Sequence, residues 1–487
     1  MHIAQDALLS ARDLVHALAG VLHARMIETH ISWVLLAQDR AYKIKKPVQL
    51  PFVDYASLQA RQRFCEEEIR LNRRLAPSLY LGVAHITGTP GSPVLDGDGP
   101  TLEYAVRMRR FAPGALFSEK ISAGNLGTED IDELAALLAG FHESAPRAEA
   151  GSGFADAHRR RQAALAALEG IRPMMDETAH RDLRSWLDTE AAALAPLWTD
   201  RLANGRVREC HGDLHLANIV RLDGGVAAFD CMEFDPALRW IDVLDDMAFV
   251  VMDLWAHQRK DLCFRFLNAW LDRTGDHGGL PALRFSVVYR ALVRAQVEQL
   301  RDAGSTAARR YLSAALAWAG PGNARLFITH GLPGSGKTFA SQQIVEREGA
   351  IRLRSDVERK RLHSLGMLED SRAMGVDIYQ AETTGRTYAH LLAVARTALQ
   401  AGYPVILDAA FLRRAERDQA HALALALRVP FCIVSCEAPL PVLRARLLAR
   451  RGDASEADGT VLDRLRETAQ ALSARERTFT QAPPPPG

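Results

Sequence analysis

The sequence lacks several features that would mark a membrane protein, a secreted protein or a nucleic-acid-binding protein. No run of about 18 apolar residues occurs, and residues 1–20 carry acids and amides instead of a basic start with an apolar core. The six cysteines form no Cys-x-x-Cys pair, and the formal net charge is only +1. We therefore expect a cytoplasmic protein with reduced thiols, no membrane contact and no electrostatic preference for nucleic acid.

Lysine is also scarce, with 7 lysines against 53 arginines. Three of these lysines are Lys43, Lys45 and Lys46, and another is Lys337. A lysine ammonium is a compact point charge that suits a phosphate oxygen, so these positions support two phosphate sites. The length of 487 residues and the hydrophobic content of 48% allow two or three domain cores.

The segment 331–338 (GLPGSGKT) matches the P-loop or Walker A pattern, Gly-x-x-x-x-Gly-Lys-Thr. In this pattern backbone N–H groups surround the phosphates, the lysine reaches the β- and γ-phosphates, and the threonine hydroxyl binds Mg²⁺. Residues 325–330 predict a buried strand and 339–347 a helix whose N-terminus faces the same anion. The expected nucleotide-binding residues are Gly331, Gly334, Ser335, Gly336, Lys337 and Thr338, and Thr338 is also an expected metal ligand.

Charged residues follow the next predicted strands. Strand 350–354 ends at Asp356, with Arg359 three positions later, where ligands of parallel sheets bind. Strand 404–407 runs into Asp408, which we expect to hold the water shell of the metal. After strand 430–436 comes an arginine-rich helix, which either closes over the transferred phosphoryl group as a lid or is a solvated face. Its arginines are Arg444, Arg446, Arg450 and Arg451.

Residues 324–480 resemble the P-loop kinases that include polynucleotide kinases, gluconate-type kinases and zeta-toxin kinases. The resemblance implies that Asp356 activates the acceptor hydroxyl and that Arg359 is its partner on the substrate side. Arg450 is the arginine that we assign to nucleotide binding. The structural alternative for Asp356 is a helix N-cap.

A second set of catalytic residues begins at residues 211–218 (HGDLHLAN). Asp213 and Asn218 have the spacing of a protein-kinase catalytic loop, in which the acid accepts the hydroxyl proton and the amide binds a metal ion. The apolar run 226–229 leads to Asp230, which we expect to be the other metal ligand. A loop, a short strand and a second loop would bring the two metal ligands to one point.

Strands and a helix upstream of this loop supply a candidate nucleotide clamp. Residues 33–37 and 40–45 predict two strands joined by a tight turn. Lys43 on the second strand is the expected phosphate-binding lysine, and Lys45, which points the same way, is the alternative. In the helix 57–75 we expect Glu68 to pair with the lysine, because Leu71 and Leu75 pack the same face inward. The alternative for Glu66, Glu67 and Glu68 is an exposed acidic cluster.

Residues 1–319 resemble the aminoglycoside phosphotransferase family and its choline and homoserine kinase relatives. The resemblance implies that Asp213 is the catalytic base, that Asn218 and Asp230 bind magnesium, and that Lys43 with Glu68 holds the nucleotide. Glu233 departs from the common pattern and is either a third metal contact or a bystander. The domain order resembles a bacterial family described as bifunctional phosphotransferase/ATP-binding proteins.

The expected fold is α/β and α+β. A bilobal protein-kinase-like domain at 1–319, with lobes at about 1–110 and 111–319, precedes a P-loop domain at 324–480 whose parallel sheet is flanked by helices. Residues 319–322 are the expected linker and 481–487 a disordered tail. We expect a kinase that uses ATP and Mg²⁺ to phosphorylate small hydroxyl-bearing molecules at both sites. The alternatives are a regulatory ATP-binding P-loop module, or a P-loop kinase that acts on a nucleic-acid end or a nucleotide-like substrate.

Overall fold

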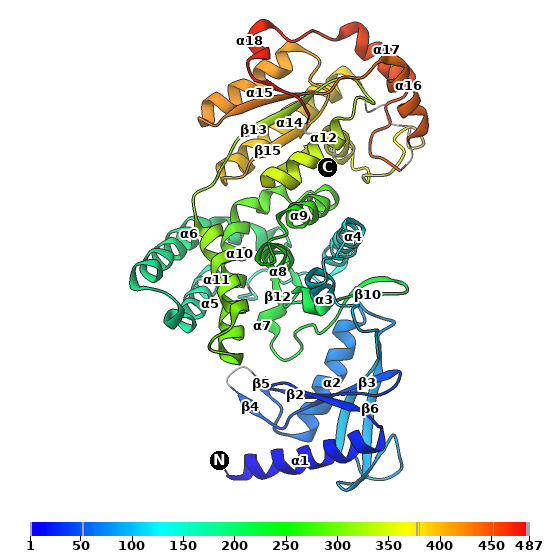
Figure 1. Ribbon diagram of the computed structural model, residues 1–487, viewed down its shortest axis with the longest axis vertical. Coiled ribbons are helices and arrows are strands. Elements are labelled where there is room, and N and C mark those ends of the chain that lie inside the picture. Colours follow the sequence, from blue (N-terminus) through cyan, green and yellow to red (C-terminus); the bar gives the residue numbers. More distant parts are fainter. Residues whose placement is uncertain are drawn as a thin grey trace. The chain divides into compact units, whose positions relative to one another are not determined.

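A computed structural model describes residues 2–50, 53–154, 156–375, 378, 380–450 and 452–483. The chain divides into two compact units, whose elements are labelled in Figure 1. The first consists of Met1–Arg159 and Trp198–Val250, and the second of Arg160–Leu197 and Val251–Gly487. Helix α8 (Val243–Ala256) begins in the first unit and ends in the second.

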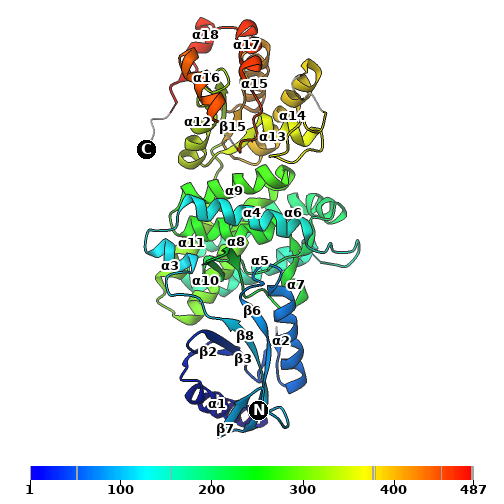
Figure 2. The same ribbon diagram turned by 90° about the vertical axis from the view of Figure 1, so that its right-hand side faces the viewer.

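The first unit contains a six-stranded antiparallel sheet in the order β1-β2-β3-β8-β6-β7. Alternate residues of its strands point to opposite faces, and each face is covered by one helix (Figure 2). Helix α1 (His2–Val21) packs on the face that carries Trp33 and Ile44, and α2 (Leu58–Asn72) on the face that carries Ala41. The strands are β1 (Arg25–Glu28), β2 (Ser32–Leu36), β3 (Arg40–Lys45), β6 (Tyr80–Thr89), β7 (Ser92–Leu95) and β8 (Glu103–Arg109). A small hairpin joins β4 (Gln49–Leu50) to β5 (Val53–Asp54).

Two short antiparallel pairs flank the loop that contains Asp213 in the rest of this unit. Strand β9 (Val207–Glu209) pairs with β12 (Trp240–Asp242), and β10 (Ile219–Leu222) forms a hairpin with β11 (Gly225–Ala228). The loop runs from β9 to the 3₁₀ turn η2 (Leu216–Asn218). The helices of this region are α3 (Phe117–Ser122), α4 (Thr128–Ser144) and α7 (Pro236–Arg239).

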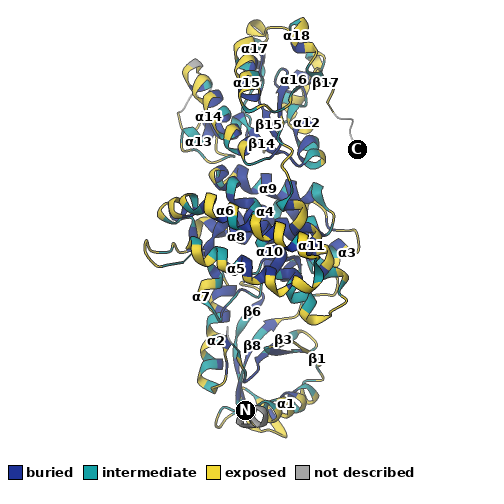
Figure 3. Ribbon diagram, turned by 90° about the vertical axis from the view of Figure 1, so that its left-hand side faces the viewer, coloured by how far each residue is buried: buried dark blue, intermediate teal, exposed yellow. Residues whose placement is uncertain are grey.

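The second unit joins a helical part to a parallel sheet. The helices that lie wholly in this unit are η1 (Arg172–Met174), α9 (Lys260–Thr274), η3 (His277–Gly279), α10 (Leu280–Arg301) and α11 (Thr306–Ala319). Most of α5 (Ala157–Gly170) and α6 (Glu177–Ala203) also belongs to it, but the first residues of α5 and the last of α6 belong to the first unit. Most of α9 is buried and is drawn in dark blue in Figure 3. The ring of Phe264, a residue of α9, packs against Trp255 and Trp318, and Trp318 also contacts Tyr403.

The five strands of the second sheet are all parallel, in the order β14-β15-β13-β16-β17. The strands are β13 (Leu326–His330), β14 (Ile351–Arg354), β15 (Val405–Asp408), β16 (Phe431–Ser435) and β17 (Thr480–Gln481). Strands β13 (LFITH) and β15 (VILD) are buried and mostly apolar, as expected for strands covered on both faces, whereas β14 (IRLR) alternates apolar residues with arginines. The helices are α12 (Lys337–Ile344), a π turn η4 (Val345–Gly349), α13 (Ser355–Leu362), α14 (Ala381–Gln400), α15 (Arg414–Leu427), α16 (Leu440–Ala449), α17 (Gly459–Thr468) and α18 (Ala474–Arg477). The predicted α+β and α/β content is thus present.

The residue directly after the predicted linker 319–322 is hydrogen-bonded to the second unit's α/β part. The backbone N–H of Asn323 donates to the carbonyl of Gly402 at 3.1 Å. Residues 251–319 belong to the same compact unit as the second sheet, so the domain bounds at 319 and 324 stay a prediction. Gln481, the first residue of the predicted tail, lies in β17, and residues 484–487 lie outside the described part. Among the described helices, none is both long and apolar enough to cross a bilayer.

Two candidate phosphate-binding sites

In the first unit, β3 and α2 bring the expected lysine and glutamate together. Nζ of Lys43 donates to Oε1 of Glu68 at 2.9 Å and to Oδ1 of Asp230 at 2.5 Å. Glu68 is fully buried, so it does not belong to an exposed acidic cluster. Burial alone would lower the pKa of Lys43, but the carboxylates of Asp230, Glu68 and Glu233 raise it well above the ordinary value. The lysine is therefore a fixed positive charge beside Asp230.

The alternative lysine occupies a different place in the same network. Nζ of Lys45 donates to Oε2 of Glu68 at 2.6 Å and also forms an ion pair with Glu233. The hydroxyl of Tyr55 donates to Oε1 of Glu233 at 2.5 Å. Burial would raise the pKa of Glu233, but Lys45 and Lys43 hold it below the usual range. Glu233 is thus not a bystander, because it is the buried partner of a second lysine, a pairing that the sequence did not predict; the third metal contact stays a prediction.

The candidate base is oriented by two neighbours on its own loop. Nδ2 of Asn218 donates to the backbone oxygen of Asp213 at 3.0 Å and to its Oδ2 at 3.3 Å. Nδ1 of His215 accepts from the N–H of Ala217 at 3.2 Å, so Nε2 carries the proton and faces Oδ2 of Asp213 at 3.3 Å. Because Nδ2 of Asn218 is used in this way, its amide oxygen is the atom suited to a cation.

The hairpin of β10 and β11 places Asn218 and Asp230 at the same end. The N–H of Phe229 donates to the carbonyl of Asn218 at 2.9 Å. The two expected metal ligands, Asn218 and Asp230, therefore lie at the hydrogen bond that ends the hairpin. Asp230 has a positive φ of 65°, and its N–H donates to the hydroxyl of Tyr80 at 3.1 Å. The carboxylate of Asp230 is 45% exposed. Carboxylate and amide oxygens are the ligands that Mg²⁺ prefers, so the residues present fit this metal.

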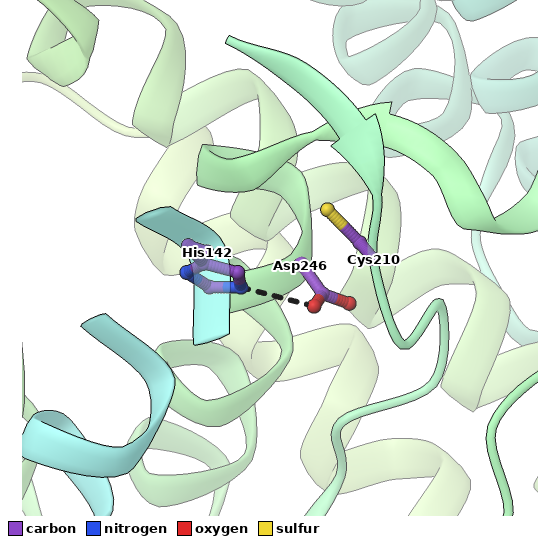
Figure 4. A group of neighbouring side chains, drawn as sticks. All are labelled: His142, Cys210 and Asp246. Atoms are coloured by element: carbon purple, nitrogen blue, oxygen red, sulfur yellow. Dashed lines mark hydrogen bonds and ion pairs between the residues drawn. The ribbon is translucent and has the colours of Figure 1, made fainter. Parts of the chain in front are cut away.

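A buried carboxylate in the first turn of α8, Asp246, holds the loop that contains Asp213, and Figure 4 shows it beside His142 and Cys210. Oδ2 of Asp246 accepts from the N–H of His211 at 3.1 Å, and Oδ1 accepts from the N–H of Gly212 at 2.8 Å. Nε2 of His142 lies 3.1 Å from Oδ2 of Asp246. Burial raises the pKa of the neighbouring Cys210 thiol well above its usual value, so a thiolate ligand is disfavoured. The group of His142, Cys210 and Asp246 therefore serves as an anchor for the loop, and the sequence had not identified His142.

In the second unit, the P-loop lies between β13 and α12 as expected. Gly331 has a φ of 147°, and a Cβ at this position would lie 2.2 Å from the carbonyl oxygen of Cys436. Gly336 is the N-cap of α12, so the N-terminus of this helix opens onto the loop. Nζ of Lys337 folds back to the carbonyl of Leu332 at 2.9 Å. Burial lowers the pKa of Lys337, partly opposed by Asp408 and Asp356.

Three further expected residues surround this loop. Oγ of Ser341 donates to Oδ2 of Asp408 at 3.0 Å and contacts the carbonyl of Thr338 at 3.0 Å, which ties the carboxylate to the first turn of α12. Nη1 of Arg359 donates to Oδ1 of Asp356 at 2.8 Å. The N-cap of α13 is Arg354, so Asp356 is a residue of the first turn and the N-cap alternative is wrong.

A cavity of about 610 Å³ opens over the P-loop. Nη1 of Arg446 donates to the carbonyl of Gly334 at 3.1 Å. Nε of Arg450 forms an ion pair with Oδ2 of Asp453 at 3.8 Å. Arg444 instead pairs with Asp463 on the exposed side, as a solvated face predicts, and Arg451 lies outside the described residues. The lining includes Gly334, Gly336, Lys337, Thr338, Asp356, Arg359, Asp408, Arg446 and Arg450. The buried hydroxyl of Ser335 has no hydrogen-bond partner among the described residues.

Comparison with known proteins identifies the class of both parts. The model of the phosphotransferase enzyme family matches residues 56–285, and that of an AAA domain family matches residues 326–472. An uncharacterized protein of Mycobacterium tuberculosis (strain ATCC 25618 / H37Rv) is 32% identical over 459 residues, which cover 92% of this chain and 89% of the relative.

Two solved structures are similar to parts of the chain. Amicoumacin kinase hAmiN, in complex with AMP-PNP, Ca²⁺ and Ami, is 11% identical, with a TM-score of 0.40 over 66% of this chain and 96% of that chain. A gluconokinase from Sinorhizobium meliloti 1021 is 19% identical, with a TM-score of 0.25 over 34% of this chain and 83% of that chain.

The protein is a phosphotransferase that joins a kinase-like fold to a P-loop domain, as the sequence predicts. More particularly, the chain belongs to the same family as the mycobacterial relative, and its residues 56–285 match the phosphotransferase enzyme family. The kinase-type domains also identify it as a nucleotide-binding transferase.

Proposed function

We propose that the protein is an ATP-dependent kinase with two separate Mg-nucleotide sites, each of which transfers the γ-phosphate to the hydroxyl of a small molecule. The observation that supports this proposal is that each unit brings together a partly buried lysine that suits a phosphate, oxygen atoms that suit a metal, and a carboxylate that suits the acceptor hydroxyl. The two lysines are Lys43 and Lys337. A purely regulatory nucleotide module has no need of the third group.

At the first site Asp213 is the proposed general base, which accepts the proton of the acceptor hydroxyl. Asn218 and His215 hold its carboxylate, so that one oxygen is kept in a fixed direction. Lys43 binds nucleotide phosphates while Glu68 orients its ammonium. Asn218 and Asp230 would hold Mg²⁺, which offsets the phosphate charge when it is bound.

At the second site the backbone of 331–336 and Lys337 surround the phosphates, and Thr338 with Asp408 would hold the metal. Asp356 is the proposed base, and Arg359 is its partner toward the acceptor. Arg446 and Arg450 line the same cavity and would stabilise charge on the transferred group. The proposed partner of each site is a small hydroxyl-bearing molecule and not a nucleic acid.

The proposal is tested by an acceptor screen with labelled ATP and the full-length chain. We expect label to appear on at least two classes of hydroxyl compound. Asp213→Asn should remove one class and Asp356→Ala the other, while the double variant transfers to neither. If Asp356→Ala left all transfer unchanged and the P-loop hydrolysed ATP only to inorganic phosphate, the second domain would be a regulatory module.

A further inference from the structure

The strand that leads to the proposed second base is an edge strand. Strand β14 is first in the sheet order and pairs only with β15 among the described strands. An edge strand leaves a row of backbone N–H and C=O groups that need partners when they are buried. Ile351 and Leu353 are fully buried, so the open side of β14 is not exposed to water.

The partner of this open side is a side chain from α9. Nδ2 of Asn268 donates to the carbonyl of Ala350 at 2.9 Å, and the N–H of Arg352 donates to Oδ1 of Asn268 at 2.6 Å. The amide of Asn268 thus supplies one donor and one acceptor, as a neighbouring strand would. Asn268 is 1% exposed, so water cannot readily take over either hydrogen bond.

A second residue of α9 extends this contact toward the P-loop helix. Asp272 is one turn after Asn268, and its Oδ2 accepts from Nη2 of Arg352 at 3.2 Å. Nη1 of the same arginine donates to Oε1 of Gln342 on α12 at 2.8 Å. Arg352 therefore connects α9 to the helix that follows the P-loop.

The approach of α9 to this sheet is too close for an ordinary side chain at one point. Gly349 has a φ of 73°, and a Cβ there would lie 2.7 Å from Cε of Lys260 and 2.8 Å from Cε2 of Phe264. After β14 in the sequence, Nη2 of Arg361 on α13 donates to the carbonyl of Asp272 at 2.6 Å. Contacts with α9 thus occur before, along and after β14.

We infer that α9 is a structural part of the second phosphate site, in which Asn268 and Asp272 are positioning residues that fix β14 and thereby Asp356 and Arg359. The role in catalysis rests on the proposed function of the second site, whereas the role in holding β14 does not. One consequence is that residues from 324 onward, without α9, lack the groups that complete the edge of their sheet.

The test uses the full-length chain and amide hydrogen exchange. Asn268→Leu keeps the size of the side chain but removes both hydrogen bonds. We expect exchange at the Arg352 amide to accelerate at least roughly tenfold, because its acceptor is lost. Arg273→Ala, an exposed change on the same helix, is the matched control and should leave exchange at Arg352 unchanged. Unchanged exchange in Asn268→Leu would overturn the inference.

Turnover separates positioning from general loss of stability. In an Asp213→Asn background, where the proposed second site alone transfers phosphate, Asn268→Leu should lower kcat at least roughly tenfold with little change in nucleotide affinity. In an Asp356→Ala background, first-site turnover should stay at the parent level. Equal losses at both sites would mean that Asn268 serves only overall stability, against the inference.

Asp272→Asn provides a second variant in case Asn268→Leu does not fold. It weakens the link to Arg352 but leaves both Asn268 hydrogen bonds, so we expect a smaller acceleration of exchange over residues 351–356 and a smaller loss of second-site kcat. Unaltered exchange and turnover in this variant would contradict the role of Asp272. Faster exchange in a chain whose second site never transfers phosphate would support the structural role and refute the proposed function of that site.

Discussion

Lys45 donates to Oε2 of Glu68 at 2.6 Å, the oxygen opposite the one that Lys43 uses. One buried carboxylate thus serves two lysines of the same strand face, but the other contacts of the lysines differ. Lys43 reaches Asp230, which is 45% exposed, whereas Lys45 reaches Glu233, which is 4% exposed. We infer that Lys43 meets the nucleotide and that Lys45 stabilises the lobe.

The two lysines should therefore respond differently to substitution by methionine. Lys43→Met should lower first-site turnover by roughly 10²-fold, because a phosphate contact is lost. Lys45→Met leaves Glu233 buried without its cation, so the free energy of unfolding should fall by about 3–5 kcal/mol. Denaturant unfolding and steady-state kinetics of both variants check this. The reverse pattern would make Lys45 the nucleotide lysine.

Asp213 and Asp230 should separate into a base and a metal ligand. In a Lys337→Ala background, Asp213→Asn keeps the shape of the side chain but removes the proton acceptor. Turnover should then fall by roughly 10²-fold or more with nucleotide affinity unchanged. Asp230→Asn should instead weaken magnesium-dependent nucleotide binding, as measured by calorimetry with and without Mg²⁺. Equal loss of binding in both variants would show that the two roles are wrongly assigned.

His277 should make stability depend on pH. Burial lowers its pKa below the ordinary 6.5, with Glu358 opposing, and its Nε2 has no hydrogen-bond partner among the described residues. The unfolded chain therefore binds the proton first as the pH falls below 6.5, and the fold loses stability in that window. His277→Phe should flatten the slope of unfolding free energy between pH 6.5 and 5 by up to about 1.4 kcal/mol per pH unit.

The exposed His30 is the control for this measurement. His30→Ala should leave the slope as it is in the parent, because the side chain is exposed and its removal changes no buried contact. Urea unfolding at several pH values gives both slopes. A slope in His277→Phe equal to that of the parent would show that His277 takes up no proton on unfolding.

The sequence predicted what depends on local pattern. The P-loop is contiguous, and the alternation of β3 with the helical spacing around Glu68 was enough to predict the pair that Lys43 and Glu68 form. It did not predict contacts between distant segments. The pairing of Lys45 with Glu233, and of His142 with Asp246, depends on how elements far apart in the sequence pack together. Neither strand alternation nor helical spacing contains this information.

The same limit applies to the second site. The end of β14 and the position of Asp356 follow from a short strand pattern and the helix start that comes directly after it. The contact of Asn268 with Ala350 and Arg352 joins an ordinary helical position to a strand far along the chain. The Gly/Pro-rich segment 319–322 separates α9 from the second sheet in the sequence, and such a boundary in composition does not show which helices pack on the sheet that follows.

The central claim is that one chain holds two nucleotide sites, and calorimetric titration with a non-hydrolysable Mg-nucleotide tests it most directly. We predict two sites per chain in the intact protein and one in Lys337→Ala, with the affinity of the remaining site unchanged. Lys43→Met combined with Lys337→Ala should greatly weaken that remaining site. A single site in the intact protein would contradict the account.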